Sequence, residues 1–193
     1  MLNTDIIVKH ILDLGIKTER LCLRKLSLDD VADMFEYTSD INNWKFIARE
    51  VHTNVSQAND FIRESIKKYD NPSDIIWGIE LQGSIDSINQ KLIGTIRIYN
   101  IDFNKGTCMI SYLLNVAFSG KGYMTEVLRA TFDTIFHSLG LKKIYADIAH
   151  GNTKSEKLVQ RCGMAKLPKY IAARKMRGQN IYISRYVIER NNI

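Results

Sequence analysis

Hydrophobic and polar positions follow two different periods in the first part of the chain. Residues 20–26 (RLCLRKL) carry apolar side chains at every second position, which is typical of a strand with one buried face. Ser27 is a favourable N-cap residue, and Asp29 and Asp30 follow it, so this position predicts the start of a helix. Apolar residues then recur at helical spacing over residues 56–69 and predict a second helix.

The middle of the chain has the period of strands. Residues 74–82, 91–101 and 107–114 read as three strands, and the short segments between them predict an antiparallel meander. A long helix is expected after the third strand, starting near Gly122, because apolar residues again recur at helical spacing. Gly140 stands at a position typical of a helix C-terminus.

The last third of the chain predicts one more helix between strands. Residues 142–150 form an expected strand, Asn152 caps the next helix, and Gly163 ends it. Two further strand patterns, at 169–176 and 180–189, complete the predicted order. Strands dominate the middle and helices are interleaved later, so the predicted fold class is α+β around a mixed sheet.

Length and composition favour one ordinary globular domain over residues 1–193. The chain has 193 residues, of which 45% are hydrophobic and 25% charged, and no Gly-, Pro- or Ser-rich linker divides it. Residues 1–16 are expected to form an N-terminal extension packed on the surface. They lack the features of a signal peptide, and no apolar run approaches the ~20 residues needed to span a bilayer, so we expect a cytoplasmic protein without membrane contact.

Charge and cysteine content narrow the classes of ligand. The net charge of +6 suits an anionic ligand, cofactor or partner. The sequence has no helix-turn-helix, zinc-finger or RNP-like pattern, so we expect no nucleic-acid partner. Cys22, Cys108 and Cys162 are scattered, without the spacing of metal ligands or of a disulfide framework, so neither a metal site nor disulfides are expected.

A glycine pair marks the start of the long helix. The third strand of the meander ends at Leu114, and Gly120 and Gly122 follow just before the helix. The first backbone N–H groups of a helix have no partner inside it, and glycine lets a ligand approach them, so this loop is a candidate phosphate site with Lys121 at its rim. A simple structural turn is the alternative, because G-x-G alone is a weak signal. Thr125 stands where a Rossmann fingerprint has its third glycine.

Several motifs together resemble one known family. Residues 120–126 read GKGYMTE, residues 152–155 match N-x-x-S, and residues 161–164 (RCGM) stand where the family has K-x-G-F. Residues 18–37 are similar to its opening T-x-R-L-x-L-R strand and helix. Over roughly residues 17–190 the chain therefore resembles the GCN5-related N-acetyltransferase (GNAT) superfamily, and most of all its ribosomal-protein-alanine and -serine N-acetyltransferase (Rim-type) branch.

The resemblance implies a fold and an acetyl donor. It implies a twisted, mixed but mostly antiparallel sheet of about seven strands, splayed in the middle and flanked by about four helices. Acetyl-CoA is expected in the gap, with its pyrophosphate on the backbone of the glycine loop and its pantetheine arm along the splayed strand. The residues expected to contact it are Tyr112, Leu113, Leu114, Ser119, Gly120, Lys121, Gly122, Tyr123, Met124, Asn152 and Ser155.

The resemblance also suggests groups for acetyl transfer. The amine must lose a proton and the leaving thiolate must be stabilised. Ser155 matches the family serine expected to form a hydrogen bond on the thiol side. Val159 stands where many members have a tyrosine, and Met109 stands where the branch has its acidic residue.

The general base stays open between three alternatives. Glu126 in the first turn of the long helix and Asp147 on the following strand are the candidate carboxylates, and a chain of waters is the third possibility. The helix dipole alone favours an acidic residue at Glu126, so that residue also has a purely structural explanation.

The acceptor is expected between two segments. Trp44 and Phe46 lie in the segment after the first helix, and Arg174 lies in the basic segment 166–177. These residues are predicted to contact the acceptor, and they suit a planar or negatively charged group. The alternative is that both aromatic residues fill the core and the basic segment is a solvated edge.

Several functions remain open at this stage. The acceptor is either a protein N-terminal amine or a small-molecule amine. The small-molecule class includes antibiotics and aminoacyl-nucleotide toxins, whose acetylation would give resistance or self-immunity. A non-catalytic CoA-binding module and a partner-binding protein are further alternatives, and the chain is expected to be a monomer or a homodimer.

Overall fold

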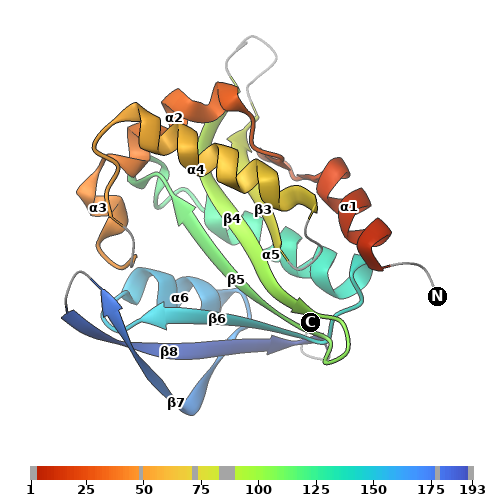
Figure 1. Cartoon of the computed structure of the whole chain (residues 1–193). Coiled ribbons are helices and arrows are strands. Elements are labelled where there is room, and N and C mark those ends of the chain that lie inside the picture. The colour runs from red at the N-terminus through yellow and green to blue at the C-terminus, as the bar shows by residue number, and fades with distance from the viewer. Residues whose placement is uncertain (1–3, 48–49, 71–73, 83–89, 177–178, 191–193) are drawn as a thin grey trace.

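The computed structural model describes residues 4–47, 50–70, 74–82, 90–176 and 179–190. Secondary structure follows the order expected for an α+β chain (Figure 1). The described helices are α1 (Thr4–Leu14), α2 (Val31–Thr38), α3 (Ile41–Trp44), α4 (Val55–Lys67), α5 (Tyr123–Asp133) and α6 (Thr153–Arg161). The described strands are β1 (Ile16–Lys17), β2 (Leu21–Arg24), β3 (Asp74–Leu81), β4 (Lys91–Asp102), β5 (Thr107–Leu114), β6 (Lys143–Ala149), β7 (Ala165–Met176) and β8 (Gln179–Glu189).

All described strands join one open sheet in the order β1-β2-β3-β4-β5-β6-β8-β7. The meander β3-β4-β5 is antiparallel, which confirms the prediction from the short connections. The pair β5–β6 is parallel, because α5 forms the crossover between them, and every other neighbouring pair is antiparallel. The sheet is therefore mixed, as predicted.

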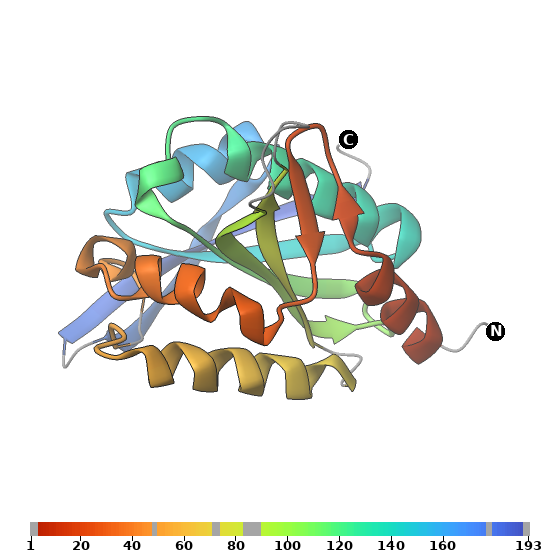
Figure 2. The ribbon, with the colours of Figure 1, turned by 90° about the horizontal axis from the view of Figure 1, so that it is seen from above.

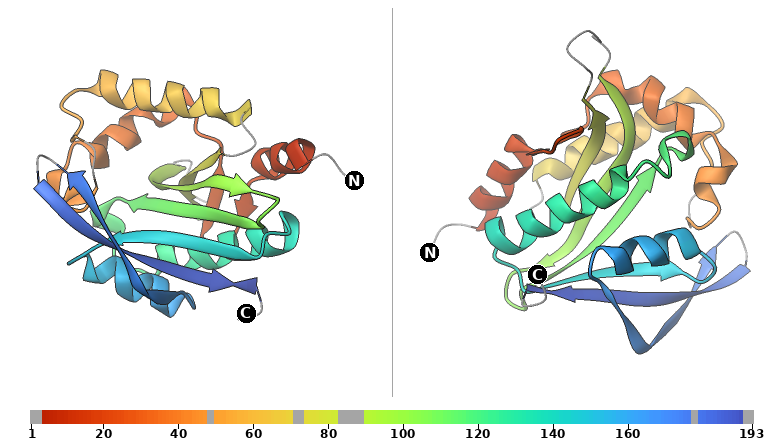
Figure 3. Two further views of the ribbon diagram at one scale, coloured as in Figure 1. Left: turned by 60° about the horizontal axis from the view of Figure 1, so that its bottom comes forward. Right: turned by 180° about the vertical axis from the view of Figure 1, so that it is seen from behind.

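Helices cover the sheet from both sides (Figure 2). Helices α2 and α4 pack on one face through a cluster that contains Met34, Ala58 and Ile62. Helices α1, α5 and α6 belong to the larger cluster on the other face, with Val127, Leu128 and Val159 among its members. In the view from behind, α5 crosses β3–β5 and α6 lies over β6 and β8 (Figure 3). The sheet is thus the middle of three layers.

The count of elements differs slightly from the expectation. The described residues contain eight strands and six α-helices, where about seven and about four were expected. The two-residue strand β1 and the short helix α3 account for part of the difference, since elements this short give little periodic signal. Helix α1 is a further helix that the sequence pattern did not predict. Residues 4–14, in the expected surface extension, bury Val8, Ile11 and Leu12 in the main core.

Strands β5 and β6 separate in the middle of the sheet. Their last paired residues are Ile110 and Ala146, although β5 continues to Leu114 and β6 to Ala149. Beyond that point β5 stays with β4 and β6 stays with β8, so the two halves of the sheet diverge toward the left in Figure 1. The backbone edge of β5 at residues 111–114 faces this gap without a strand partner from β6. This is the splay that the family resemblance implies.

Candidate functional site

The glycine loop lies at the end of the splayed strand β5. Gly120 has φ +81° and Gly122 has φ +82°, a left-handed conformation that glycine adopts without strain. A Cβ atom built on Gly120 would meet no heavy atom within 4 Å, so the space above this residue is open. Both glycines are therefore required by the backbone, and one of them borders open space.

Backbone donors converge at the same place. The N–H groups of Thr125 and Glu126 reach Gly122 O at 3.1 Å each, which begins the hydrogen bonding of α5. The N–H groups before Thr125 have no acceptor within the helix and lie at the positive end of its dipole. Such a helix start suits a phosphate group. The loop geometry therefore fits the pyrophosphate expected there.

The side chain of Lys121 lies at the edge of the proposed phosphate site. Its Nζ atom lies 5.3 Å from the centre of the Phe118 ring, and the residue is exposed. Its backbone carbonyl instead accepts a hydrogen bond from Arg20 Nη1 at 3.0 Å. This arrangement is consistent with a rim position for the ammonium group.

Arg20 and Glu126 connect the loop to the start of β2. Glu126 Oε2 accepts from Arg20 Nε at 2.8 Å, and Glu126 Oε1 accepts from the Arg20 backbone N–H at 3.0 Å and from Thr18 Oγ1 at 2.5 Å. The Arg20 guanidinium also lies 4.7 Å from the centre of the Tyr123 ring. We call Thr18, Arg20 and Glu126 the Arg20 clamp. Sequence reasoning missed this clamp, because Glu126 lies more than 100 positions along the chain from Thr18 and Arg20.

The hydrogen bonds of the Arg20 clamp make Glu126 a poor candidate for the general base. Burial alone would raise the pKa of Glu126, but the hydrogen bonds from Thr18 and Arg20 outweigh it and lower the pKa. A carboxylate with a lowered pKa and occupied oxygen atoms is a weak proton acceptor. The hydrogen bonds give Glu126 a structural role at the loop, and a catalytic role for it stays a prediction that this geometry does not support.

Asp147, the other candidate carboxylate, is also committed to an arginine. Arg185 donates to both of its oxygens, Nε to Oδ1 at 2.7 Å and Nη2 to Oδ2 at 2.9 Å, and the Asp147 side chain is only 4% exposed. Breaking a buried pair of this kind is costly, so it rarely serves as a base. The geometry of the described residues therefore favours a water molecule, rather than Glu126 or Asp147, as the general base.

Helix α6 begins beside the gap. Asn152 is its N-cap, and its Oδ1 accepts from Ser155 N at 3.3 Å, so the structural role expected of Asn152 is present. Ser155 is half-buried in the first turn. Tyr112 projects from the splayed part of β5 toward the same helix layer, and its hydroxyl oxygen is buried without a hydrogen-bond partner of normal geometry among the described residues.

The predicted acceptor residues are not brought together as contacts. Trp44 is 3% exposed, and its Nε1 donates to Thr38 O at 2.6 Å, so it fills the core and anchors α3. This burial supports the alternative that Trp44 fills the core, and its contact with the acceptor stays a prediction. Phe46 is half-buried, and its ring lies near Gly151 after β6, which places it close to the gap.

Most side chains of the basic segment 166–177 lie outside the described part of the structure. Arg174 pairs with Ile181 across the β7–β8 hairpin, but its side chain lies outside the described part of the structure. Arg177, at the end of the segment, falls outside the described residues altogether. Contact between Arg174 and the acceptor therefore stays a prediction.

The sheet face under α2 and α4 carries a row of residues that sequence reasoning did not single out. Met109 of β5 is paired with Tyr99 of β4 on one side and with Tyr145 of β6 on the other. All three side chains are half-buried, and we call them the Tyr-Met-Tyr row. Met109 was noted only for the acidic residue it replaces, whereas the strand register shows its two aromatic neighbours.

Two ion pairs flank this row. Arg97 donates through Nε to Asp74 Oδ1 at 2.6 Å, and its guanidinium lies 5.0 Å from the centre of the Tyr99 ring. On the other side, the guanidinium of Arg185, already paired with Asp147, lies 5.7 Å from the centre of the Tyr145 ring. The carboxylates of these two ion pairs, Asp74 and Asp147, are thus neutralised within the protein.

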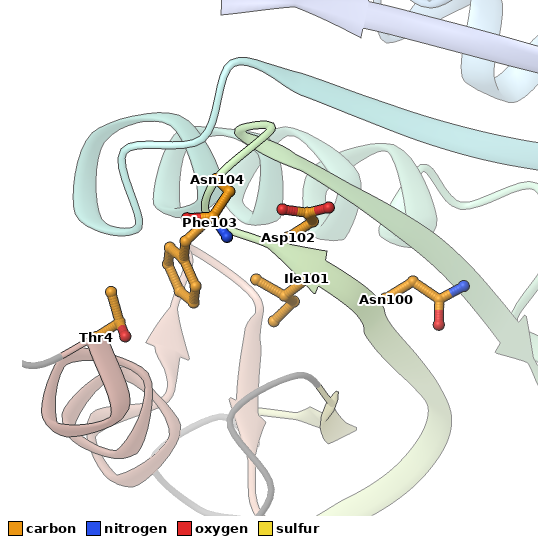
Figure 4. Close-up of a pocket in the computed structure, with 6 residues that line it drawn as sticks. All are labelled: Thr4, Asn100, Ile101, Asp102, Phe103 and Asn104. Carbon is orange, nitrogen blue, oxygen red and sulfur yellow. The ribbon is translucent and has the colours of Figure 1, made fainter.

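Other candidate features lie away from the gap. A pocket of ≈ 600 Å³ is lined by Thr4 and by residues 100–104, which form the end of β4 and the start of the β4–β5 turn, at the opposite end of β5 from the glycine loop (Figure 4). Among the described residues, no group of three His, Cys, Asp or Glu side chains is arranged to hold a metal ion. None of the helices described here has the length and apolar character needed to cross a membrane.

Comparison with known proteins agrees with this geometry. The model of the acetyltransferase (GNAT) domain family matches residues 20–165. A curated relative named uncharacterized N-acetyltransferase p20, from Bacillus licheniformis, is 32% identical over 155 residues, which cover 77% of this chain and 81% of the relative.

Solved structures share the fold. The microcin C7 self-immunity acetyltransferase MccE, solved with acetyl-CoA and AMP, has a TM-score of 0.77 and 21% identity, with 92% of this chain and 99% of that chain covered. The spermidine N-acetyltransferase of Vibrio cholerae, solved with CoA and spermine, has a TM-score of 0.74 and 19% identity, with 91% and 98% covered. At these identities the likeness concerns the fold alone.

Proposed function

The chain belongs to the GNAT acetyltransferase family, and we propose on this basis that it transfers an acetyl group directly from acetyl-CoA to a primary amine in one ternary complex. Membership makes the protein an acetyl-CoA-dependent N-acetyltransferase. The proposal concerns the route of transfer and the acceptor. We also propose that residues 1–193 form one such domain, with α1 as part of its core.

The observation that carries the proposal is the separation of β5 from β6 after Ile110 and Ala146. It leaves a backbone edge at residues 112–114, which suits the amide groups of a pantetheine arm, because an extended ligand can pair with an open strand edge. The glycine loop at the end of this edge supplies the N–H groups of residues 120–124 for the pyrophosphate, since the Ser119 N–H already donates to Val116 O. The pyrophosphate and the thioester of acetyl-CoA would thereby be held at a fixed distance from each other.

The chemistry needs few side chains once both substrates are bound. Holding the amine next to the thioester contributes roughly 7–11 kcal/mol of barrier reduction in well-oriented systems. A backbone N–H near Leu113 or Leu114 polarises the carbonyl, and the Ser155 hydroxyl donates a hydrogen bond to the sulfur. Water accepts the proton that the amine loses, since Glu126 and Asp147 are both held by arginine.

The acceptor is proposed to approach over the Tyr-Met-Tyr row, from the face under α2 and α4. Two rings and a thioether favour an apolar or aromatic substituent next to the amine. The neighbouring carboxylates Asp74 and Asp147 already pair with Arg97 and Arg185, so this face is poorly suited to a polycation. Phe46 is proposed to close the opposite side of the cleft. An N-terminal amine of a protein and an aminoacyl nucleotide both meet these requirements.

One experiment tests the proposal in two steps. The melting temperature is first measured with and without acetyl-CoA, and thiol release is then followed with peptides, aminoacyl nucleotides, aromatic amines and spermidine. We expect a higher melting temperature with acetyl-CoA, and thiol release with amines that carry an apolar substituent. Binding without thiol release on any amine would favour a non-catalytic CoA-binding module. No thermal shift would contradict the donor site itself.

A further inference from the structure

Ser111 lies at the point where β5 and β6 separate. It is the first residue of β5 after the last pair with β6, which joins Ile110 to Ala146. Ile110 belongs to the main core cluster, so the Ser111 side chain lies on the other face of the sheet. Leu113, two residues further along that face, packs against the cluster of α2 and α4. Because Ser111 is exposed, its hydroxyl borders the side of the gap from which the acceptor is proposed to approach.

Arg97 is the direct cross-strand neighbour of Ser111. The two residues are paired in the register of β4 and β5, so their Cβ atoms lie about 5 Å apart on one face. Asp74 holds the Arg97 guanidinium in place, because Nε and Nη2 both donate to its carboxylate. The ring of Tyr99 lies 5.0 Å from the guanidinium and restricts it further. A hydroxyl and a fixed guanidinium therefore stand side by side next to the gap.

The Arg97 guanidinium has more donors than Asp74 uses. Arginine carries five N–H groups in one plane, and the bonds to Asp74 from Nε and Nη2 leave both N–H groups of Nη1 for another acceptor. The Arg97 side chain is 29% exposed, so a bound molecule can reach it. Arg97 and Asp74 together carry no net charge. Their surroundings therefore suit a neutral carbonyl oxygen, to which both Arg97 and Ser111 can donate.

We propose that Arg97 and Ser111 bind a carbonyl group attached to the carbon that bears the acceptor amine, so that the acceptor is a 2-amino carbonyl compound; this rests on the function proposed above. Ser111 donates through its hydroxyl and Arg97 through Nη1, and we call the two residues the carbonyl subsite. The thioester is proposed to lie at the backbone of Leu113 or Leu114, and two residues of a strand span about 7 Å. An aminoacyl group bridges this distance with the amine at the thioester and the carbonyl oxygen at the subsite, each contact being about 3 Å.

The carbonyl subsite separates two kinds of amine that the Tyr-Met-Tyr row does not distinguish. A peptide N-terminus and an aminoacyl nucleotide both carry the carbonyl group, whereas an alkylamine with the same apolar substituent lacks it. A site that hydrogen-bonds one substrate discriminates against the analogue that leaves its donors unpaired. The row is thus expected to select the apolar substituent, and the subsite is expected to select the group between that substituent and the rest of the acceptor.

The test compares two amines that differ only in the carbonyl group. Phenylalaninamide and phenethylamine present the same ring, and the ratio of their kcat/KM values is measured by competition at one pH. An acyl group lowers the pKa of the neighbouring amine in any enzyme, so the evidence is the change of this ratio between variants. We expect the ratio to fall about fivefold in Ser111→Ala and about tenfold in Arg97→Lys. Competition in one mixture makes the ratio independent of the amount of folded enzyme.

Two variants are controls for the Ser111 hydroxyl. Ser111→Thr keeps a hydroxyl at the same position and should leave the ratio within about twofold. Thr107→Val removes a hydroxyl from the same face of β5, four residues earlier, where β5 is still paired with β6. It should also leave the ratio within about twofold. An unchanged ratio in Ser111→Ala, or an equal fall in Thr107→Val, would overturn the carbonyl subsite.

A binding measurement makes the same comparison without turnover. The affinities of both amines for the protein saturated with CoA are measured by calorimetry, and the preference for phenylalaninamide should fall about fivefold in Ser111→Ala. An equal loss of affinity for both amines would assign Ser111 a purely structural role and would overturn the subsite. Absence of acetyl transfer to every amine tried would instead contradict the proposed function, on which the subsite depends.

Discussion

Arg20 and Glu126 form a two-point contact between the turn before β2 and the first turn of α5, with Arg20 Nε 2.8 Å and Nη2 2.6 Å from Glu126 Oε2. The same guanidinium donates to Lys121 O at 3.0 Å, inside the glycine loop. One arginine thus holds both the loop and the helix that follows it. A planar guanidinium with several fixed donors is suited to this, and a lysine is not.

Removal of the Arg20 side chain should loosen the donor site. We expect Arg20→Ala to raise the KM for acetyl-CoA about tenfold through loss of charge-assisted hydrogen bonds, with kcat within about threefold. Arg20→Lys should recover little, because one ammonium cannot bridge Glu126 and Lys121 O. Steady-state kinetics at saturating acceptor measure both values. Lys25→Ala is the control, since Lys25 pairs with the exposed Asp13 away from the loop; an equal rise in KM there would refute the clamp.

Glu126 should contribute to stability in a pH-dependent way. Its folded pKa is lowered below the ordinary 4.5, so the contribution is fully present above that value and is lost as the pH falls through the folded pKa. The difference in the free energy of unfolding between the unmodified protein and Glu126→Gln should therefore be constant from about pH 7 to about pH 6 and shrink below about pH 4. Urea unfolding at a series of pH values measures it.

The same variant separates a structural role from catalysis. Because Glu126 is not the proposed base, kcat of Glu126→Gln should stay within about threefold, with an unchanged pH profile. A loss of kcat of about a hundredfold or more, together with the loss of a titration from that profile, would restore Glu126 as the base.

The open space over Gly120 gives a sharp test of the phosphate loop. Gly120 and Gly140 have φ +81° and +67°, and a Cβ on either would meet nothing within 4 Å. Gly120→Ala and Gly140→Ala should therefore lose similar stability, about 1 kcal/mol each, from backbone strain. Only Gly120→Ala should weaken acetyl-CoA binding, because only that residue borders the proposed phosphate site. Calorimetry on both variants decides the matter, and equal affinities would exclude the loop.

Local patterns accounted for most of the fold. The meander followed from two-residue alternation and short connections, and the starts of α5 and α6 followed from Gly122 and the Asn152 cap. Such signals lie within a few residues of the feature they predict. The insertion of β8 between β6 and β7 is a non-local pairing, and periodicity carries no information about it.

The site was predictable where it depends on backbone and less so where it depends on side-chain partners. Glycines and an N-cap serve backbone geometry, so their motif located the loop and the start of α6. Glu126 and Asp147 were candidate general bases because they are carboxylates. Their arginine partners lie 106 and 38 residues away along the chain, so these ion pairs left no sign in the sequence. Burial of Trp44 likewise depends on tertiary packing, which one sequence does not reveal.

Trp44 should matter for stability and not for acceptor binding. Its ring is buried and its Nε1 is bonded to Thr38 O, so Trp44→Ala should cost about 3–5 kcal/mol of unfolding free energy. Trp44→Phe should cost less, because most of the apolar volume is kept. Urea unfolding gives the stability, and acceptor KM is measured where both variants stay folded. A raised acceptor KM in Trp44→Phe with little loss of stability would return Trp44 to the acceptor site.

Met109 should decide which amines are accepted. It lies between Tyr99 and Tyr145, and the adjacent carboxylates are paired with arginine, so the unmodified protein should prefer amines with apolar substituents over spermidine. Met109→Glu places an unpaired carboxylate between two rings, and a cationic acceptor would relieve its desolvation. We expect the ratio of kcat/KM for spermidine to that for an apolar amine to rise at least tenfold, since close charge pairing contributes about 1.4 kcal/mol or more.

Met109→Leu is the control for that change, because it keeps volume and apolar character and should alter the ratio by less than about threefold. Both ratios come from competition assays with spermidine and an apolar amine in one mixture, so that differences in enzyme concentration cancel. If Met109→Leu changed the preference as much as Met109→Glu, shape would control selectivity and charge would not. If the unmodified protein already preferred spermidine, the acceptor would bind elsewhere than on the Tyr-Met-Tyr row, since that row carries no negative charge of its own.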